Sequence, residues 1–222
     1  MQVETIHRTP ATIPEQVQLD VGYAQPEDID AVLDVIARGM RDNPMHVAVY
    51  GDDPDLRYAR LRLLFQAAFR IGGLSEHMLV ARTADGTIVT VCGMVPPEEP
   101  LPTGFDQIKL LVQVLRLGPR TAQRVTKWLA TWNRLDLKDR HWHVGPLVVD
   151  AHLQGQGIGS HLLNVFCKQM DSYGETAYLE TDKLVNVAFH ERFGFEVVHT
   201  EAVLGVPNWF MRRDAQPVVV QL

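Results

Sequence analysis

Hydrophobic and polar positions follow two periodicities along the chain, and each predicts one kind of secondary structure. Apolar residues at helical spacing begin after Pro26, recur over 56–71, and continue after the glycine-rich turn that ends at Gly159. Another helical stretch covers 105–140, with a break at Gly118-Pro119. Strand-like runs occupy 17–23, 77–82, 87–95, 141–149, 177–180, 196–204 and 208–212.

This order of elements predicts a single α/β domain. A chain of 222 residues that is 46% hydrophobic can bury the core of one such domain. We expect the domain to cover 17–214, with the helical stretch 105–140 inside it. The segments 1–16 and 215–222 are expected to be an arm and a tail.

Proline and glycine mark the expected connections between these elements. Asn43-Pro44 and the segment 51–54 are expected to break the chain between the first two long helices. A short helix over 186–193 is expected to stop at Gly194, and 205–207 should connect the last two strands as a hairpin.

The segment 145–160 is the most informative stretch for function. An apolar strand ends near Val149, a turn dense in glycine follows, and a helix begins. Glycines at 155, 157 and 159 allow the main chain to approach a ligand closely, and the unpaired amides at a helix start favour a phosphate. The stretch therefore predicts a site for a diphosphate.

Two phosphate-binding motifs fit this stretch poorly. A nucleoside triphosphate-binding loop needs a lysine before its last Ser or Thr, and Gly159-Ser160 has none. A dinucleotide fingerprint would place Gly155, Gly157 and Ser160 at its glycine positions, which leaves it one glycine short. Glu180, about 20 residues on, lies where a ribose-binding acid is expected, so this alternative stays open.

The third interpretation takes the turn as Q-x-x-G-x-G, from Gln154 to Gly159. Two further segments accompany it in order, Y-L-E-T-D at 178–182 and N-V-A-F-H-E-R-F-G-F at 186–195. Together these patterns resemble the GNAT superfamily of N-acetyltransferases, and the segment 178–182 is similar to the puromycin N-acetyltransferase-like members. The resemblance implies an α/β fold with a mixed, mostly antiparallel seven-stranded sheet. In that fold strands 4 and 5 splay apart and helices cover both faces.

The resemblance also implies a binding site for acetyl-coenzyme A. The backbone of the fourth strand would pair with the pantetheine arm, the turn would hold the pyrophosphate, and a side chain on the short helix would bond the arm. The residues that match these roles are Leu147, Val148, Val149, Gln154, Gly155, Gln156, Gly157, Ile158, Gly159, Ser160 and Asn186.

Two residues are expected to carry the chemistry by the same resemblance. His190 stands where most family members have the tyrosine that protonates the departing thiolate, and an imidazolium can take over that role. Glu180, near the end of the fifth strand, would be the base. The alternatives are a site role other than acid for His190, or simple packing, and a solvated or ion-paired carboxylate for Glu180.

The acceptor site is less clearly marked. By resemblance the first two helices form its walls, so Tyr50, Arg57, Tyr58 and Phe65 are candidates to line it. The resemblance to the puromycin N-acetyltransferase-like members also implies that 105–140 is a helical insertion over this site. Trp128 and Trp132 share a helix face, which fits either core packing or a substrate platform. The segment 106–140 carries eight Lys and Arg against three Asp, either as a solvated helix face or as a basic element near the phosphates of coenzyme A.

Composition narrows the classes of partner and compartment. The formal net charge of −6 argues against a nucleic-acid partner. The sequence has no apolar run near 18 residues, so no membrane association is expected. Its two cysteines, Cys92 and Cys167, fit a reducing cytoplasm. His141 and His143 alternate along a strand without a further ligand motif, so no metal site is expected.

The function expected from these observations is direct transfer of an acetyl group from acetyl-coenzyme A to a primary amine of a small molecule, in a ternary complex. Homodimerisation is left open. Two other classes also remain: a non-catalytic acyl-coenzyme A sensor or interaction domain, and a nicotinamide-dependent oxidoreductase.

Overall fold

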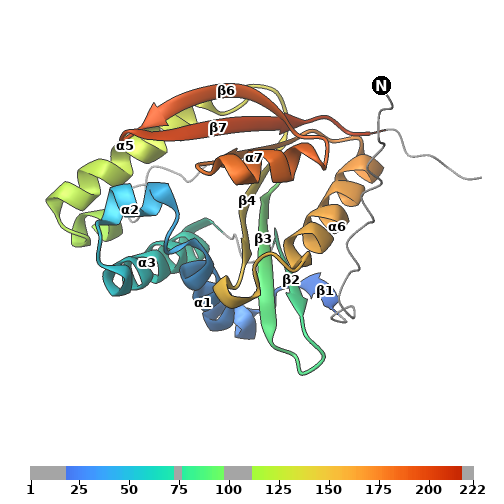
Figure 1. The fold of residues 1–222 in the computed structure, drawn as a ribbon, viewed down its shortest axis with the longest axis horizontal. Helices are drawn as coiled ribbons and strands as arrows, with labels where there is room; N and C mark the ends of the chain where they lie inside the picture. The colour runs from blue at the N-terminus through green and yellow to red at the C-terminus, as the bar shows by residue number, and fades with distance from the viewer. Residues whose placement is uncertain (1–18, 73–76, 98–111, 217–222) are drawn as a thin grey trace, which may run out of the picture.

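The computed structural model describes residues 19–72, 77–97 and 112–216, which form one seven-stranded sheet with helices on both faces (Figure 1). The strands are β1 Asp20–Tyr23, β2 Met78–Arg82, β3 Ile88–Val95, β4 Trp142–Val149, β5 Ala177–Thr181, β6 Glu196–Val203 and β7 Val206–Arg213. The helices are α1 Ile29–Met40, α2 Pro44–Tyr50, α3 Pro54–Gly72, α5 Pro119–Leu135, α6 Ile158–Tyr173 and α7 Leu184–Glu191. Two short 3-10 turns, η1 Pro26–Asp28 and η3 Ala151–Leu153, precede α1 and α6. The predicted fold class is confirmed.

The sheet is mixed, and its single parallel contact is short. The strand order is β1-β2-β3-β4-β5-β7-β6, and every pairing except that of β4 with β5 is antiparallel. β4 and β5 pair only through Trp142 with Ala177 and His143 with Tyr178. Beyond this point the described parts of the two strands have no paired residues, so one edge of β4 from Val144 onward is left open. The predicted splay between strands 4 and 5 is confirmed.

A bulge in β4 accompanies this separation. Cys92 pairs with Leu147 and Met94 with Val144, so two residues of β4, Gly145 and Pro146, lie opposite the one residue Gly93. A Cβ atom on Gly93 would lie 2.5 Å from the carbonyl oxygen of Gly145. Glycine at this position therefore allows the two backbones to approach at the bulge.

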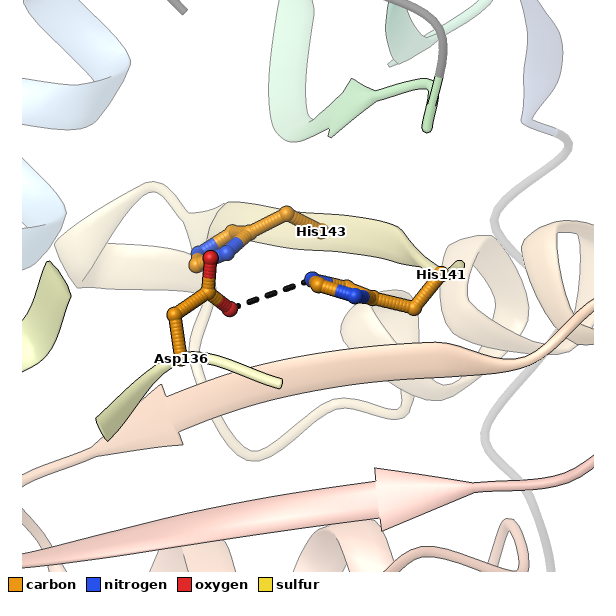
Figure 2. Close-up of side chains that lie close together, drawn as sticks. All are labelled: Asp136, His141 and His143. Atoms are coloured by element: carbon orange, nitrogen blue, oxygen red, sulfur yellow. Dashed lines mark ion pairs between the residues drawn. The ribbon is translucent and has the colours of Figure 1, made fainter. Parts of the chain in front are cut away.

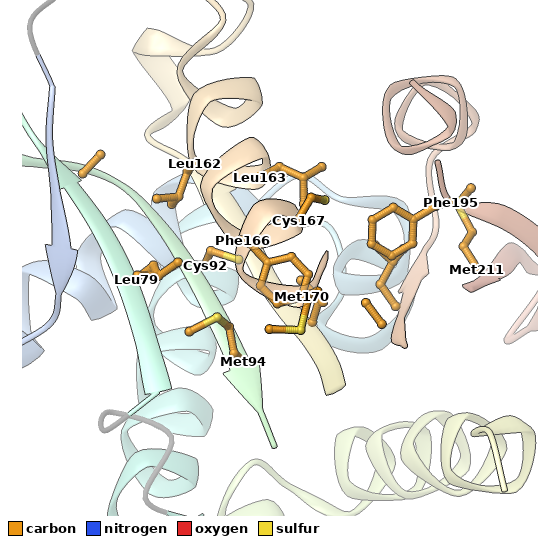
Figure 3. Packing of buried hydrophobic residues seen from close by; sticks show 14 of the residues in the cluster. Leu79, Cys92, Met94, Leu162, Leu163, Phe166, Cys167, Met170, Phe195 and Met211 are labelled. Atoms are coloured by element: carbon orange, nitrogen blue, oxygen red, sulfur yellow. The ribbon is translucent and has the colours of Figure 1, made fainter. Parts of the chain in front are cut away.

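One face of the sheet is covered by α6, and the core between them is rich in sulfur (Figure 3). Phe166 and Leu162 of α6 are fully buried against Leu79 of β2 and Met94 of β3. The apolar positions of α6 recur three, four and five residues apart, as the sequence predicted. This packing fixes the start of α6 at the end of β4.

The opposite face is covered by α1 and α3, with α2 and α5 extending the layer toward β6 and β7 (Figure 1). Alternate residues of β2, Met78 and Val80, point into this second core, whereas Leu79 and Ala81 belong to the first. At its far end α5 packs against α2 through Trp128.

Some local predictions were wrong. The residues between the two expected breaks, at Asn43-Pro44 and 51–54, form a helix that was not predicted, α2, because Pro44 fits the first helical turn and Gly51 ends the helix with φ 92°. The last hairpin turns at Leu204-Gly205, and Pro207 pairs with Ala202 inside the ladder. The stop at Gly194, with φ 85°, is confirmed.

The expected arm 1–16 and the segment 98–111 at the start of the predicted insertion lie outside the described residues. Among the described helices, none has the length and apolar character needed to span a bilayer.

Candidate active site

A cavity of about 710 Å³ lies between the end of β4, the start of α6 and the helix α7. The turn that leads into α6 forms one wall. Gly155 and Gly157 have φ of 80° and 83°, a region that favours glycine, and Gly157 is the residue immediately before the helix. No side chain caps this helix start, so the amides of its first turn keep their donors available.

Contacts of the turn hold it against the rest of the domain. The Gln154 side-chain amide donates to the carbonyl oxygens of Val149, at 3.1 Å, and of Gly39 on α1, at 3.4 Å. Asp150, which is buried, accepts from the Arg38 guanidinium at 2.6 Å and contacts His152 Nδ1 at 2.9 Å. A Cβ on Gly159 would lie 3.1 Å from a methyl group of Val149. The turn is thus fixed to α1 and β4 by the side chains of Gln154 and Asp150.

Most residues predicted to bind coenzyme A line this cavity. Those that do are Leu147, Val148, Val149, Gln154, Gly155, Gly157, Ile158, Gly159, Ser160 and Asn186, and the predicted catalytic residue His190 lines it as well. Gln156 is exposed and does not line the cavity. Glu180 lies elsewhere, as described below. Lys183 and Arg192, at the two ends of α7, also line the cavity, and neither was selected from the sequence.

A second cavity, of about 310 Å³, adjoins the first. Its walls come from α2, α3, α5, the bulged part of β4 and the end of β5. The two cavities share five lining residues, namely Met40, Asn43, Leu147, Asn186 and His190. A molecule in one cavity can therefore meet a molecule in the other at the gap between β4 and β5.

Glu180 faces this second cavity together with His143. Nε2 of His143 lies 3.0 Å from Oε2 of Glu180, and the Glu180 side chain is only 3% exposed, against 32% for His143. Burial lowers the pKa of His143, but the charge and hydrogen bond of Glu180 and the charge of Asp136 outweigh it, so the pKa is raised. The pair places a proton acceptor on the cavity wall.

The pair continues into a network of ionisable groups (Figure 2). His141 Nε2 lies 3.1 Å from Asp136 Oδ1, and His141 Nδ1 lies 2.8 Å from the carbonyl oxygen of Asp139. The hydrogen bond to Asp136 raises the pKa of His141. Burial raises the pKa of Asp136, but the hydrogen bond from His141 and the charges of both histidines lower it by more, so the net pKa lies below its usual range.

Asp136, His141 and His143 could also hold a metal ion. Each offers one ligand atom, and these atoms lie within 4.8 Å of one another. Sequence reasoning had no third ligand because Asp136 belongs to the end of the preceding helix. Each histidine already has a carboxylate partner, Asp136 for His141 and Glu180 for His143. The arrangement is thus complete as an ion-pair network.

His190 lies at the junction of the two cavities, on α7. It is buried beside Phe189 and Phe195, with ring centroids at 5.0 and 5.7 Å. Burial lowers the pKa of His190 to about 4, and its Nδ1 has no hydrogen-bond partner among the described residues. The imidazole is therefore neutral at pH 7, and the imidazolium on which the predicted acid role depends is not its resting form.

The candidate residues for the acceptor site divide between the second cavity and structural roles. Phe65, Trp128 and Trp132 line it. Arg57 instead connects the ends of α1 and α2, donating to the carbonyl oxygens of Arg41 and Gly51 and to Asp42. Tyr58 donates to Asp34 at 2.6 Å, and Tyr50 is buried in the core. Tyr50, Arg57 and Tyr58 are therefore not among the residues that line the second cavity.

The basic segment does not reach the larger cavity. Its described part contains α5, which contributes Trp128, Leu129 and Trp132 to the second cavity. None of its described Lys or Arg residues lines the larger cavity. Of the two alternatives for this segment, a basic element near the phosphates of coenzyme A therefore has no support from the described part, whereas Lys183 and Arg192 of the α7 region do line the larger cavity.

The site thus combines parted strands, a glycine-rich helix start without a side-chain cap, and a second cavity across the gap. The model of the acetyltransferase (GNAT) family matches residues 52–195, and the chain belongs to this family. The alternative of a dinucleotide-binding oxidoreductase is wrong, since the sheet is mostly antiparallel and Glu180 pairs with His143.

Solved structures share this fold at low sequence identity. A protein from Corynebacterium glutamicum described as histone acetyltransferase HPA2 and related acetyltransferase is 22% identical, with a TM-score of 0.68 over 90% of this chain and 99% of that one. The polyamine N-acetyltransferase of Drosophila melanogaster is 13% identical, with a TM-score of 0.59 over 89% and 100%. Arylalkylamine N-acetyltransferase 2 from Aedes aegypti is 14% identical, with a TM-score of 0.54 over 89% and 99%.

Proposed function

We propose that this protein transfers an acetyl group from acetyl-coenzyme A to a primary amine of a small molecule while both substrates are bound. The observation that carries the proposal is the pair of adjoining cavities, which share His190, Asn186 and Leu147. The first cavity offers amides and cations, and the second offers a carboxylate–histidine pair. This difference suits an anionic donor and a cationic acceptor.

The larger cavity fits coenzyme A by its own residues. Amides of the first turn of α6, at Ile158, Gly159 and Ser160, would hold the pyrophosphate, and Lys183 and Arg192 would add positive charge. When bound, acetyl-coenzyme A supplies a thioester whose acetyl group is activated for attack by an amine.

The open edge of β4 would hold the extended arm as an added strand. The amide of Asp150 donates to the carbonyl oxygen of Val89 on β3. Because bonding directions alternate along an antiparallel strand, the amide of Val149 is directed to the opposite edge, toward the gap. There it can donate to the carbonyl oxygen of the acetyl group and polarise it.

An amine must be neutral before it attacks, so the site needs a proton acceptor. The sequence assigned this role to Glu180, but that carboxylate is almost entirely enclosed and contacts the more exposed His143. We assign proton acceptance to the pair, with His143 facing the amine and Glu180 orienting its ring. The proton then has a route outward by way of Asp136 and His141.

His190 is assigned a hydrogen-bonding role toward the leaving sulfur. A neutral imidazole carries one N–H, which can stabilise a thiolate without transferring its proton. The partnerless Nδ1 of His190 at the cavity junction is consistent with a bond that forms only when substrate is present. In this arrangement the attacking nitrogen is the source of the proton that the sulfur finally gains.

A covalent acyl-enzyme is disfavoured by the position of both cysteines. Burial raises the pKa of Cys92 to about 12 and that of Cys167 to about 11. Both side chains belong to the core between α6 and the sheet, and neither is among the described residues that line the two cavities. Direct transfer therefore remains, and it needs no metal ion, so incubation with a chelator is expected to leave the activity unchanged.

Release of free thiol from acetyl-coenzyme A, measured with and without a panel of primary amines, tests the proposal. We expect release that depends on the amine, and an amide product one acetyl group heavier. Tight binding of acetyl-coenzyme A without turnover on any amine would support the sensor alternative instead. A cytoplasmic location, the absence of a nucleic-acid partner and the likeness of 178–182 to puromycin N-acetyltransferase-like members stay predictions.

A further inference from the structure

The second cavity has two chemically different ends. Near the gap lie the carboxylates of Glu180 and Asp182, on and just after β5. The far end is formed by apolar side chains of α3 and α5: Leu64, Phe65, Ala68, Trp128, Leu129 and Trp132. A ligand in this cavity thus meets negative charge at one end only.

Among the described residues, no charged side chain lines the far end of the cavity. The described lining contains no Lys or Arg, and its acidic residues are Glu180 and Asp182, so α3 and α5 contribute no charged side chain to it. His46 on α2 contacts the rings of Trp128 and Tyr50, and burial lowers its pKa, so it is neutral at pH 7. Asp182 already accepts from the Met45 amide at 2.6 Å, and it belongs to the end near the gap.

The apolar end is rigid and aromatic. Trp128 and Trp132 meet edge to face with ring centroids 5.1 Å apart, and Trp132 Nε1 donates to Asn208 at 3.1 Å. Phe65 belongs to the same cluster. Rings held in this way favour a further aromatic or bulky apolar group over a methylene chain that ends in an ammonium group.

The volume sets the size of the body that fits. At about 30 Å³ for each water of liquid, a cavity of about 310 Å³ corresponds to about ten waters. One ring with a short side chain fills such a space. A second ammonium group at the far end would lose its hydration without gaining a carboxylate, which is strongly unfavourable.

We propose that the acceptor is a primary amine with a single positive charge and an apolar body of about one aromatic ring. The amine lies at the Glu180 end of the cavity, and the ring lies between α3 and α5. This inference rests on the proposed acetyl transfer and narrows its substrate.

The test compares kcat/KM for 2-phenylethylamine with that for 1,4-diaminobutane and agmatine, at saturating acetyl-coenzyme A. We expect the aromatic monoamine to exceed both dications by at least about 100-fold. Equal or better acetylation of a dication would overturn this inference while acetyl transfer itself stands. Absence of transfer to every amine would overturn the proposed function, and the inference with it.

A charge-introducing variant gives a second readout. Ala68→Asp places a carboxylate at the apolar end, and we expect it to raise kcat/KM for 1,4-diaminobutane relative to 2-phenylethylamine by about tenfold or more. Leu63→Asp, on the exposed side of the same helix and outside the cavity lining, is the matched control and should leave the ratio unchanged. Unchanged ratios in both variants, with acetyl-coenzyme A still bound, would contradict the placement of the ligand.

Discussion

His143 Nε2 lies 3.0 Å from Glu180 Oε2. His143 belongs to the last residue pair that joins β4 to β5, and Glu180 lies two residues beyond that pair on β5. The two strands are thus held together by backbone at Trp142 and His143 and by a side-chain ion pair at the start of the gap. The gap proposed to admit the cofactor and the pair proposed to accept a proton therefore both arise from the same arrangement of β4 and β5.

Activity is expected to depend on the protonation of His143. Its pKa is raised by Glu180 and Asp136 against the effect of burial, and His141 and Tyr178 are its other neighbours. Only neutral His143 accepts a proton, so kcat/KM should fall as the pH drops through this raised pKa. Glu180→Gln removes the main source of the raise and should move the acidic limb to lower pH, with kcat/KM lower by about 100-fold. An acidic limb that stays in place in Glu180→Gln would remove the pair from the mechanism.

His190 should influence turnover without setting the pH profile. Because burial lowers its pKa to about 4, it stays neutral between pH 6 and 9. His190→Phe removes the N–H at the cavity junction and should lower kcat about tenfold, the effect of one hydrogen bond of about 1.4 kcal/mol, with little change in the Kd of coenzyme A. His190→Gln, which restores a donor, should recover part of the loss. Wild-type kcat for both variants would exclude a role at the sulfur.

The backbone of the glycine turn should determine donor affinity. Gly157 has φ 83°, and a side chain there costs about 1–2 kcal/mol in the left-handed region. Gly157→Ala should therefore weaken coenzyme A binding about tenfold in calorimetry, because the amides of α6 lose their alignment. Gly22→Ala in β1, where a Cβ meets nothing within 4 Å, is the control and should bind as wild type. Equal affinity of Gly157→Ala and wild type would place the pyrophosphate elsewhere.

The ion pair of Arg38 with Asp150 should stabilise the fold. The carboxylate side chain of Asp150 is 4% exposed, and Arg38→Leu removes its guanidinium partner and leaves only the exposed His152 beside it. Since Arg38 itself is 43% exposed and screened by water, we expect a loss of about 1–2 kcal/mol in the free energy of unfolding by urea. Arg41→Leu, which breaks an exposed pair with Asp42, should cost at most about 0.5 kcal/mol.

The same pair gives a pH dependence of stability. Burial raises the pKa of Asp150, but Arg38 and His152 lower it more, so the net pKa lies below its usual range. A carboxyl whose pKa is lowered by folding stabilises the protein at neutral pH, and this contribution disappears as the pH falls through the lowered value. The difference between wild type and Arg38→Leu should thus shrink in acid. A difference that is constant with pH would contradict the assignment.

The donor side of the site could be predicted from sequence because its chemistry is local. The end of β4, the glycine turn and the start of α6 are consecutive, and the positive φ values at Gly155 and Gly157 follow from the glycines themselves. The exception is Gln156, which belongs to the matched motif but does not line the cavity.

The acceptor side could not be predicted, because it is assembled from distant segments. The contact of His143 with Glu180 depends on the register of β4 with β5, and Trp128 comes from an insertion without a motif. Helical periodicity locates α3, but it does not show that Tyr58 bonds Asp34 while Phe65 faces the cavity. The neutral state of His190 results from packing that brings Phe195 beside it.

The central claim, that donor and acceptor occupy two joined cavities at once, is tested most directly by initial rates over a grid of acetyl-coenzyme A and 2-phenylethylamine concentrations. Simultaneous occupancy predicts double-reciprocal lines that intersect. Parallel lines, or thiol release at the same rate without any amine, would contradict it.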